Sequence, residues 1–442
     1  MFRKSRILLV GVCATAVAML GVAPAVAQSS SDTPKATEIG VTAKEIHIAV
    51  LADVDNSLAP GLFKGAADGV KGAAKYLNSK AGGGGVAGRK LVVDFIDTHL
   101  NANDIITACQ NDYAMVGTFV LFLSNVDDEI NCTNQAGDAI GIPDLASVAT
   151  GVPQACSPVA FPVSPAQLVC STKDQDPQTY NGNQFEAKYL LKKNKNELSG
   201  PMIYGSDTKD AQRGGEVLIN TEIKAGIKAT QTLGISGRDP QSAYTPVVNK
   251  MKTDGSNYAY DASSAQSNIL LRSEAQLQGL DSSKITFVCT IACYDKAVKA
   301  QADVMEGQYV PLTFLPFEEA STNTTLAAFL KYVGKDNANG FAVYGWTATL
   351  GFKQAVEAIV KKDGVNGLTR ENMLSTGIDG LTSFNAGGMI GSVDIKNKVP
   401  TACSMITQLQ KGKFVRLAPT KKGTFDCSKS NAVQIKANLI SQ

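Results

Sequence analysis

Histidine and tryptophan are scarce in this sequence. Its 442 residues include two histidines, His47 and His99, and a single tryptophan, Trp346. No Gly-x-Ser-x-Gly, His-Glu-x-x-His or P-loop pattern occurs, and these patterns carry the usual machinery of hydrolases, zinc proteases and phosphate-binding enzymes. Neither histidine lies near a cysteine cluster in the sequence, and Cys-x-x-Cys is missing. We therefore expect no enzyme activity, no metal site and no cofactor.

An excess of charge of either sign is also missing. Lysine and arginine number 42, against 40 aspartates and glutamates. Without the first 27 residues, which contain three basic residues and no acidic one, the balance becomes 39 basic against 40 acidic residues. A chain so close to neutral is not expected to bind nucleic acid or an anionic lipid surface.

Long apolar runs are absent except near the N-terminus. Three basic residues among the first six precede an apolar run that ends near Val22, and Ala25-Val26-Ala27 offers the small residues of a cleavage site. This order is typical of a secretory signal peptide, cleaved near Ala27. A membrane anchor would need about 20 apolar residues, and lipid attachment at Cys13 would need a small residue where Val12 stands. We therefore predict an exported protein without a lipid.

Eight cysteines follow the signal peptide. An even number in an exported chain indicates disulfide bonds, and nearest-neighbour pairing is the simplest of many connectivities. The expected pairs are Cys109–Cys132, Cys156–Cys170, Cys289–Cys293 and Cys403–Cys427. The ring closed by Cys289 and Cys293 is short and needs special geometry, so this pair is the first that we would give up. Buried thiols are the alternative.

The stretch from Glu45 to Asp97 predicts the architecture. Residues 45–51 form an apolar, β-branched run typical of a buried strand. Apolar residues from Leu62 to Leu77 recur at helical spacing, and residues 88–97 give a second strand. Strand, crossover helix and strand form a right-handed βαβ unit, which requires a parallel sheet. The fold class is therefore expected to be α/β.

The same alternation continues along the chain. Strands are expected at 114–120, 142–146, 201–205, 258–260 and 285–288, and helices at 127–139, 211–225, 243–253, 265–277, 326–333 and 348–360. Residues 404–417 predict a β-hairpin with its turn at 410–413. About 415 residues after the signal peptide exceed what one hydrophobic core usually serves, so we expect two lobes.

Four short segments carry a family resemblance. They are Gly88-Arg89-Lys90 before the second strand, Asp97 at its end, Val116-Gly117 in the third strand and Gly141-Ile142-Pro143 before the fourth. In this order, over residues 45–427, the chain resembles the type I periplasmic solute-binding proteins of ABC importers, in the branch that binds leucine, isoleucine and valine. The resemblance implies two α/β lobes, each with a parallel sheet, joined by a hinge of three crossovers. It also implies a first-lobe disulfide, where Cys109 and Cys132 are similarly placed.

The resemblance also divides the chain into segments. After the signal peptide at 1–27 and a disordered lead-in at 28–43, the N-terminal lobe takes residues 44–163 and 312–390, and the C-terminal lobe takes 164–311 and 391–442. Residues 161–165 and 307–312 are the expected first and second crossovers, because both are extended segments that contain proline.

Ligands of open α/β sheets bind beyond the carboxyl ends of the strands. The polar and aromatic residues expected at those ends are therefore the candidate ligand contacts: Asp55, Asn56, Ser57, Thr118, Phe119, Ser147, Ser206, Ser263, Thr290 and Tyr294. Trp346 is a further candidate contact, because the resemblance places the helix that follows it near the cleft. The alternative for Trp346 is a position in the hydrophobic core. For the others the alternative is a solvated loop.

Two loops depart from the amino-acid-binding pattern. Amino-acid-binding members of the family carry a Ser-rich loop for the α-carboxylate and a Glu for the ammonium group, where this chain has residues 117–122 and 289–293. A buried ammonium group without a carboxylate partner is costly, so an α-amino acid is disfavoured. Phe119, Phe122 and Ile291 favour a more apolar solute, such as an aromatic or alicyclic carboxylate.

We therefore predict a monomer of the periplasm or cell envelope that captures a small apolar metabolite between two lobes and delivers it to the permease subunits of an ABC importer. An exported ligand-sensing receptor ectodomain is the alternative, because it would bind ligands in the same way. A branched-chain amino-acid-binding protein is a further alternative.

Overall fold

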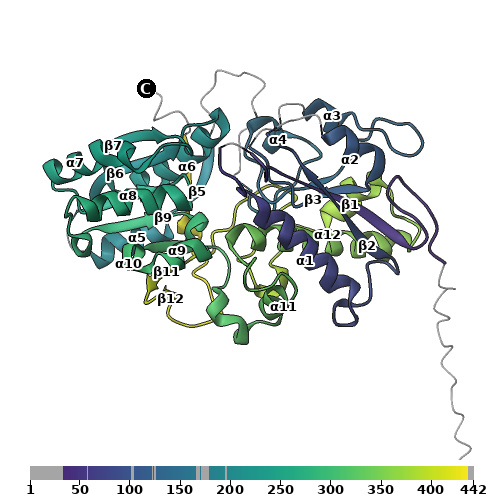
Figure 1. Cartoon of the computed structure of the whole chain (residues 1–442). Helices are drawn as coiled ribbons and strands as arrows, with labels where there is room; N and C mark the ends of the chain where they lie inside the picture. The colour runs from purple at the N-terminus through teal and green to yellow at the C-terminus, as the bar shows by residue number, and fades with distance from the viewer. Residues whose placement is uncertain are drawn as a thin grey trace, which may run out of the picture.

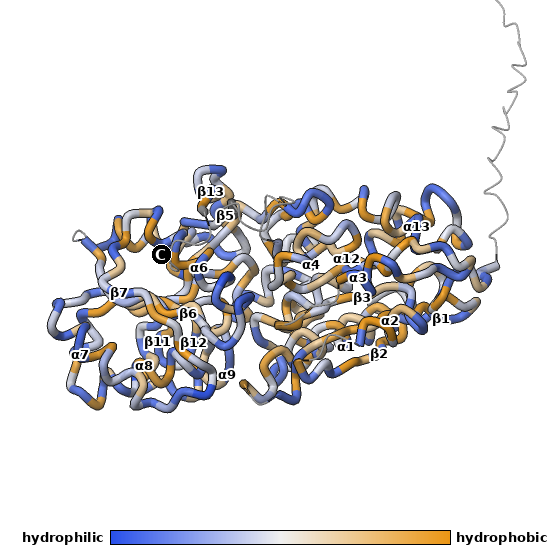
Figure 2. The backbone as a smooth tube through the Cα atoms, turned by 90° about the horizontal axis from the view of Figure 1, so that it is seen from above, coloured by the Kyte–Doolittle hydropathy of each residue, from blue (hydrophilic) through white to orange (hydrophobic). Residues whose placement is uncertain are grey.

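The computed structural model describes residues 33–56, 58–100, 104–121, 123, 126–165, 170, 179–194 and 197–436. Two lobes lie side by side, each built on a sheet with helices packed against it (Figure 1). The hydrophobic segments lie inside each lobe, and the most hydrophilic turns lie at the periphery (Figure 2). The architecture confirms the expected two-lobed α/β fold.

The first lobe contains a four-stranded sheet in the order β2-β1-β3-β4, with all neighbours parallel. Its strands are β1 (Glu45–Ala52), β2 (Lys90–Asp97), β3 (Ala114–Val116) and β4 (Asp144–Leu145). Its helices are α1 (Lys64–Asn78), α2 (Ile105–Asn111), α3 (Val126–Ile130), α4 (Val152–Cys156), α11 (Thr324–Tyr332), α12 (Gly340–Asp363) and α13 (Arg370–Asn372). The βαβ unit predicted from the first strand is therefore present.

Glycines allow α1 and α12 to approach each other closely. A β-carbon at Gly69 would lie 2.1 Å from the carbonyl oxygen of Ala342, and one at Gly345 would lie 2.0 Å from that of Ala66. No real side chain fits at such distances, so these positions require glycine. Because the two backbones touch, the start of α12 is held against the start of α1.

Two helices of the first lobe differ from the sequence prediction. The helix expected at 127–139 ends at Ile130, because the chain then forms a turn in which the Asn134 side chain accepts from the backbone N–H groups of Ala136 and Asp138. The helix expected at 348–360 begins instead at Gly340, where the Asn339 side chain caps it by accepting from the N–H of Ala342.

The second lobe contains a seven-stranded sheet in the order β12-β11-β10-β9-β8-β6-β7, parallel from β7 to β10 and antiparallel from β10 to β12. Its strands are β6 (Ser199–Gly205), β7 (Lys228–Ile235), β8 (Tyr258–Asp261), β9 (Thr286–Cys289), β10 (Tyr309–Leu312), β11 (Met405–Gln410) and β12 (Lys413–Ala418). Its helices are α5 (Phe185–Lys193), α6 (Lys209–Ala225), α7 (Thr245–Asp254), α8 (Ala265–Leu277), α9 (Lys296–Ala300) and α10 (Ala302–Met305).

The C-terminal hairpin and a small extra sheet complete this lobe. β11 and β12 form the predicted antiparallel hairpin. Residues 309–312, which we expected within a crossover, form β10 instead, because they pair with both β9 and β11 before the chain leaves the lobe. β13 (Ala432–Lys436) pairs with β5 (Thr179–Asn183) in a separate two-stranded sheet that sequence patterning did not indicate.

The crossovers between the lobes lie next to one another. The N–H of Gly391 donates to the carbonyl of Thr313 at 2.8 Å, and Ser404 lies beside the carbonyl of Leu312. The hydroxyl of Tyr344 on α12 is within hydrogen-bonding reach of both Ser164 and Thr313; burial raises the pKa of this tyrosine and the two hydrogen bonds lower it. One side chain of the first lobe therefore contacts two of the three crossovers.

The lobe boundaries drawn from the sequence stay a prediction. Residues after 390 still pack on the first lobe, since Ile395 lies with Leu145 and Phe384 around Gly351 of α12, each 3.8 Å from the position of a β-carbon there. The next strand of the second sheet begins only at Met405. The third crossover therefore lies between these two points.

All four expected disulfides are present. They are Cys109–Cys132, Cys156–Cys170, Cys289–Cys293 and Cys403–Cys427. The doubtful short ring is among them, with the two Cα atoms 6.0 Å apart. Among the described residues, no helix is both long and apolar enough to cross a membrane. The predicted signal peptide, its cleavage near Ala27 and residues 28–32 of the lead-in lie outside the described residues. From residue 33 on, the lead-in that we expected to be disordered packs on the first lobe instead: the hydroxyl of Thr37 donates to the carbonyl of Leu368 at 2.7 Å, and Val41 is buried and bridges to Ile46.

Candidate ligand-binding site

The loops at the carboxyl ends of the two sheets meet between the lobes. Leu58 follows β1, and a β-carbon at Gly237, which follows β7, would lie 2.9 Å from the carbonyl oxygen of Leu58. Gly151 follows β4, and a β-carbon there would lie 2.9 Å from the carboxylate of Asp210 at the start of α6. These strand ends are where open α/β sheets bind ligands. The two lobes are close together in this conformation.

Three phenylalanines gather at this edge of the first lobe. The rings of Phe63 and Phe119 stack with centroids 3.7 Å apart, and the edge of Phe341 meets both, at 5.5 and 5.1 Å. Phe63 precedes α1, Phe119 follows β3, and Phe341 is the second residue of α12. Phe63 and Phe119 are buried, and Phe341 is half-buried. We call these residues the phenylalanine cluster.

Sequence reasoning found only Phe119 of this cluster. Phe63 lies inside the apolar pattern of α1, where it looked like an ordinary core residue, and Phe341 lies in the helix turn that we had not expected. Ile291, at the start of the 3-10 helix η4 (Ile291–Cys293), lies against the same region, because a β-carbon at Gly340 would be 2.8 Å from its carbonyl oxygen. The apolar character of this edge therefore comes from both lobes.

The loop after β1 is held in place by a buried carboxylate. Asp53 accepts hydrogen bonds from the hydroxyl of Thr98 and the N–H groups of Leu100 and Leu121, at 2.8 and 2.6 Å for the latter two. Asn56 is buried, and its side chain accepts from the N–H groups of Leu58 and Ala59. Both side chains shape the loop.

The neighbouring candidates in this loop differ in exposure. Asp55 is exposed, its N–H donates to Asp97, and its carbonyl pairs with the imidazole of His99 at 2.8 Å. Ser57 and Phe122 lie outside the described residues. Asp55 is therefore exposed at the surface, and the ligand role of every candidate in this loop stays a prediction.

Two candidates on the strand ends of the first lobe are fully buried. The hydroxyl of Ser147 donates to the carbonyl of Gly117 at 2.9 Å. Thr118 lies beside Asp144, whose pKa burial raises to about 7, against the hydrogen bonds from Gln154 and Thr118 that lower it. These side chains hold β3 and β4 together beneath the phenylalanine cluster.

The candidates of the second lobe lie at the ends of β6, β8 and β9. Ser206 is exposed, and its N–H donates to Ile235. Ser263 is half-buried and donates to Asp261 at 2.5 Å, and burial raises the pKa of that aspartate to about 6. Thr290 caps η4 by accepting from the N–H of Ala292. The structure places all three on the expected side of the sheet.

Two candidates pack inside the protein. Tyr294 is 1% exposed; its hydroxyl donates to Glu318 at 2.7 Å and accepts from the N–H of Phe317. Trp346 is fully buried, with its ring against Tyr76 and Phe329. Because Trp346 is within α12 and not before the helix, its side chain joins the core between α1 and α12. We leave both out of the proposed contact set.

Two charged residues lie at the start of α6, and the first of them contacts the first lobe. Asp210, beside Gly151, is partly desolvated, which raises its pKa, and the guanidinium of Arg213 one turn later opposes that rise. Arg213 is half-buried. A guanidinium on a helix near the strand ends can pair with a ligand carboxylate. Neither residue was singled out from the sequence, because a charge pair on a helix is common.

Two lobes joined by three crossovers, with polar and aromatic side chains at strand ends that face each other, define a two-lobed ligand-binding protein. Residues 45–413 match the model of the periplasmic binding protein family, so this chain belongs to that family. It is a family of exported, solute-binding proteins. Among curated proteins, no sequence matches this chain.

Solved structures show the same fold at low sequence identity. A fatty acid ABC transporter substrate-binding protein from Thermomonospora curvata is 16% identical, with a TM-score of 0.64 over 89% of this chain and 95% of that one. A solute-binding protein from R. palustris in complex with benzoate is 14% identical, with a TM-score of 0.61 over 87% and 98%. A leucine-binding protein from Thermotoga maritima is 13% identical, with a TM-score of 0.61 over 84% and 98%.

Proposed function

We propose that this protein binds a small, largely apolar carboxylate between its lobes and delivers it to the permease subunits of an ABC importer. An aromatic or alicyclic acid is the expected ligand. The observation that carries the proposal is the phenylalanine cluster, because its three rings make the carboxyl edge of the first sheet apolar, and this fold takes its ligand at that edge.

The second lobe would supply the polar part of the site. Arg213 offers a guanidinium, and Ser263 and Thr290 offer hydroxyl groups at the neighbouring strand ends. A carboxylate bound by these groups would place its apolar part toward Phe119 and Phe341. Among the structural relatives, proteins solved with benzoate and with p-hydroxybenzoic acid, and one named for fatty acids, support this class of ligand.

An α-amino acid fits the described residues less well. An ammonium group between the lobes would need a carboxylate partner, and the η4 loop offers Thr290, Ile291 and Ala292. Asp210 lies against the first lobe at Gly151, but it stands beside Arg213. We therefore expect leucine to bind weakly, although one relative is a leucine-binding protein.

The experiment is a thermal-shift and calorimetric panel on the exported form of the protein. The panel contains benzoate, 4-hydroxybenzoate, cyclohexanecarboxylate, a medium-chain fatty acid and leucine. A ligand at about 100 times its Kd stabilises the folded state by roughly 2.7 kcal/mol, which is a readily measured rise in melting temperature. A rise with leucine and none with the acids would refute the proposed ligand class and leave the solute-binding role in place.

A sensory receptor ectodomain is the second candidate, since another structural relative is described as an extracellular ligand-binding receptor. Both roles require the same ligand site. Uptake of radiolabelled ligand by cells with and without the gene separates them, because only an importer component changes the rate of uptake.

A further inference from the structure

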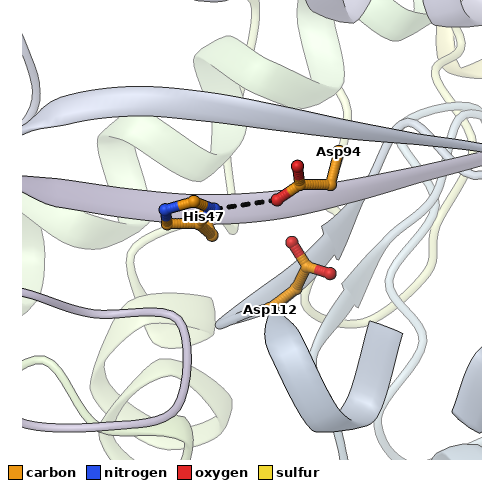
Figure 3. A group of neighbouring side chains, drawn as sticks. All are labelled: His47, Asp94 and Asp112. Atoms are coloured by element: carbon orange, nitrogen blue, oxygen red, sulfur yellow. Dashed lines mark hydrogen bonds and ion pairs between the residues drawn. The ribbon is translucent and has the colours of Figure 1, made fainter. Parts of the chain in front are cut away.

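A histidine and two aspartates converge on the first lobe, away from the ligand-binding site. His47 lies on β1, Asp94 on β2, and Asp112 follows α2. The Nδ1 atom of His47 lies 2.8 Å from a carboxylate oxygen of Asp94. One ligand atom from each of the three residues lies within 4.8 Å of the others. Figure 3 shows the carboxyl group of Asp112 pointing toward the other two side chains.

The backbone brings these residues together. In the parallel pairing of β1 with β2, His47 lies opposite Val92, and Asp94 lies opposite Ala49. Side chains two residues apart on a strand share a face, so His47 and Ala49 point to the same side of the sheet. Asp94, opposite Ala49, therefore lies on the same face as His47, two residues farther along the neighbouring strand. The N–H of Tyr113 donates to the carbonyl of His47 at 2.9 Å, which fixes Asp112 beside the histidine.

The environment of Asp112 indicates that an ion binds here. Its side chain is 1% exposed, and its Oδ1 atom is buried with no hydrogen-bond partner among the described residues. The guanidinium of Arg370 donates to the backbone carbonyl of Asp112, at 2.5 Å. A buried carboxyl oxygen without a hydrogen-bond partner is costly, and a bound cation would remove that cost.

On the side of the site away from buried Asp112, His47 and Asp94 are open to solvent. His47 and Asp94 have side chains that are 30% and 44% exposed, and they line a shallow pocket of about 600 Å³ together with Thr42, Phe95, Asn111 and Asp112. An ion can therefore enter from solvent and keep water on its free side. Glu45 lies near the rim, 3.5 Å from Nε2 of His47.

We propose that His47, Asp94 and Asp112 bind a divalent transition-metal ion of the zinc type. One imidazole and two carboxylates are ligands that zinc accepts, with water as the fourth. Bonds of about 2.0–2.2 Å hold tetrahedral ligands roughly 3.5 Å apart. His47 and Asp94, now 2.8 Å apart, must therefore separate slightly while both move toward Asp112 by about 1 Å. The two half-exposed side chains have the freedom to do so, and buried Asp112 provides the fixed point.

The ion stabilises the first lobe and does not contact the solute. His47 is the third residue of β1, and the loop of the ligand-binding site begins at Asp53, six residues on. At about 3.3 Å per residue, the two points are roughly 20 Å apart along the strand. The site joins β1, β2 and the end of α2.

Zinc itself is the probe for the test. The protein is freed of metal with a chelator, and zinc binding is followed by calorimetry and by the change in melting temperature. We expect one zinc ion per chain, a higher melting temperature with zinc, and a loss of affinity of at least about tenfold in His47→Ala and in Asp112→Asn. His99→Ala is the matched control, since His99 also lies near an aspartate, at 3.7 Å from Asp97, but no third metal-ligating side chain of the described residues completes a group with them.

The outcomes separate clearly. Equal zinc binding by the wild type and by both ligand variants would overturn the proposal, as would no binding by the wild type at millimolar zinc. Displacement of zinc by equal concentrations of magnesium would also overturn it, because magnesium does not favour imidazole. If Asp112→Asn fails to fold, His47→Ala decides the result, since the half-exposed His47 side chain can be shortened without opening the core.

Discussion

Phe63 and Phe119 stack face to face, with ring centroids 3.7 Å apart and ring planes 10° from parallel. The two residues come from different elements of the first lobe, and they meet at the edge of the sheet that faces the second lobe. Phe341 closes one side of this pair from the start of α12. The pair makes this edge of the sheet apolar, and the first prediction concerns it.

Replacing Phe119 by leucine should lower the affinity for an aromatic carboxylate by about three- to tenfold, because a favourable ring contact is worth roughly 0.5–1.5 kcal/mol beyond its area. The affinity for an aliphatic acid should change less. Titration calorimetry with benzoate and with a medium-chain fatty acid measures both values. Phe329→Leu is the matched control, since Phe329 is fully buried in the core against Trp346. Equal loss in both variants would show that the effect is structural.

Gly345→Ala should destabilise the first lobe by about 1–3 kcal/mol. The new methyl group would lie 2.0 Å from the backbone carbonyl of Ala66, so α1 and α12 would have to move apart. Urea unfolding measures the change. In the control variant Gly214→Ala, the new methyl group meets no atom within 4 Å. Alanine there should be neutral or stabilise by up to about 1 kcal/mol, because it favours the helix. An unchanged unfolding midpoint for Gly345→Ala would contradict the close packing.

A buried acid pair in the second lobe should make stability depend on pH. Burial raises the pKa of Glu222 to about 7, against hydrogen bonds from Glu186 and Tyr258 that lower it. The pKa of Glu186 is raised well above its usual value, first by burial and then by the charge of neighbouring Glu222. A folded-state pKa above the unfolded value means that the folded protein holds more protons. This contribution to stability is complete below pH 4 and is lost as the pH rises through 7.

Glu222→Gln should remove part of this pH dependence. Relative to the wild type, the variant should gain stability between pH 5 and pH 8, by on the order of 1 kcal/mol at the upper end. Melting temperatures at a series of pH values measure the difference. Glu357→Gln is the control, because Glu357 lies on the exposed face of α12 in a surface ion pair with Lys353. Parallel curves for wild type and Glu222→Gln would be inconsistent with a titrating pair.

Arg416→Ala should destabilise the protein by about 3–5 kcal/mol. Arg416 on β12 forms a two-bond ion pair with Glu319, at 2.5 and 2.7 Å, and the side chains are 4% and 3% exposed. The substitution leaves a buried carboxylate without its partner. Lys353→Ala breaks an exposed pair and should cost at most about 1 kcal/mol. Chemical denaturation compares the two variants, and a cost for Arg416→Ala as small as that for Lys353→Ala would rule out a buried charge pair.

Local pattern was sufficient for much of the fold. The apolar run of β1, the helical spacing of α1 and the turn of the β11–β12 hairpin are signals carried by neighbouring residues, and each element formed where it was predicted. The disulfides also followed from the sequence, because nearest-neighbour pairs close short loops. Helix ends were less certain. The start of α12 depends on the Asn339 cap and on glycine contacts with α1, and the second of these involves residues far away in the chain.

The amino-acid sequence by itself determined the α/β class, the two lobes and the strand ends at which a ligand should bind, since these depend on periodicity and chain order. Only the tertiary structure decided what each polar or aromatic residue contacts. It placed Trp346 in the core, joined Phe63 and Phe341 to Phe119, and brought His47 to Asp94 and Asp112. Such groupings arise from strand register and helix packing, which join residues that no local pattern connects.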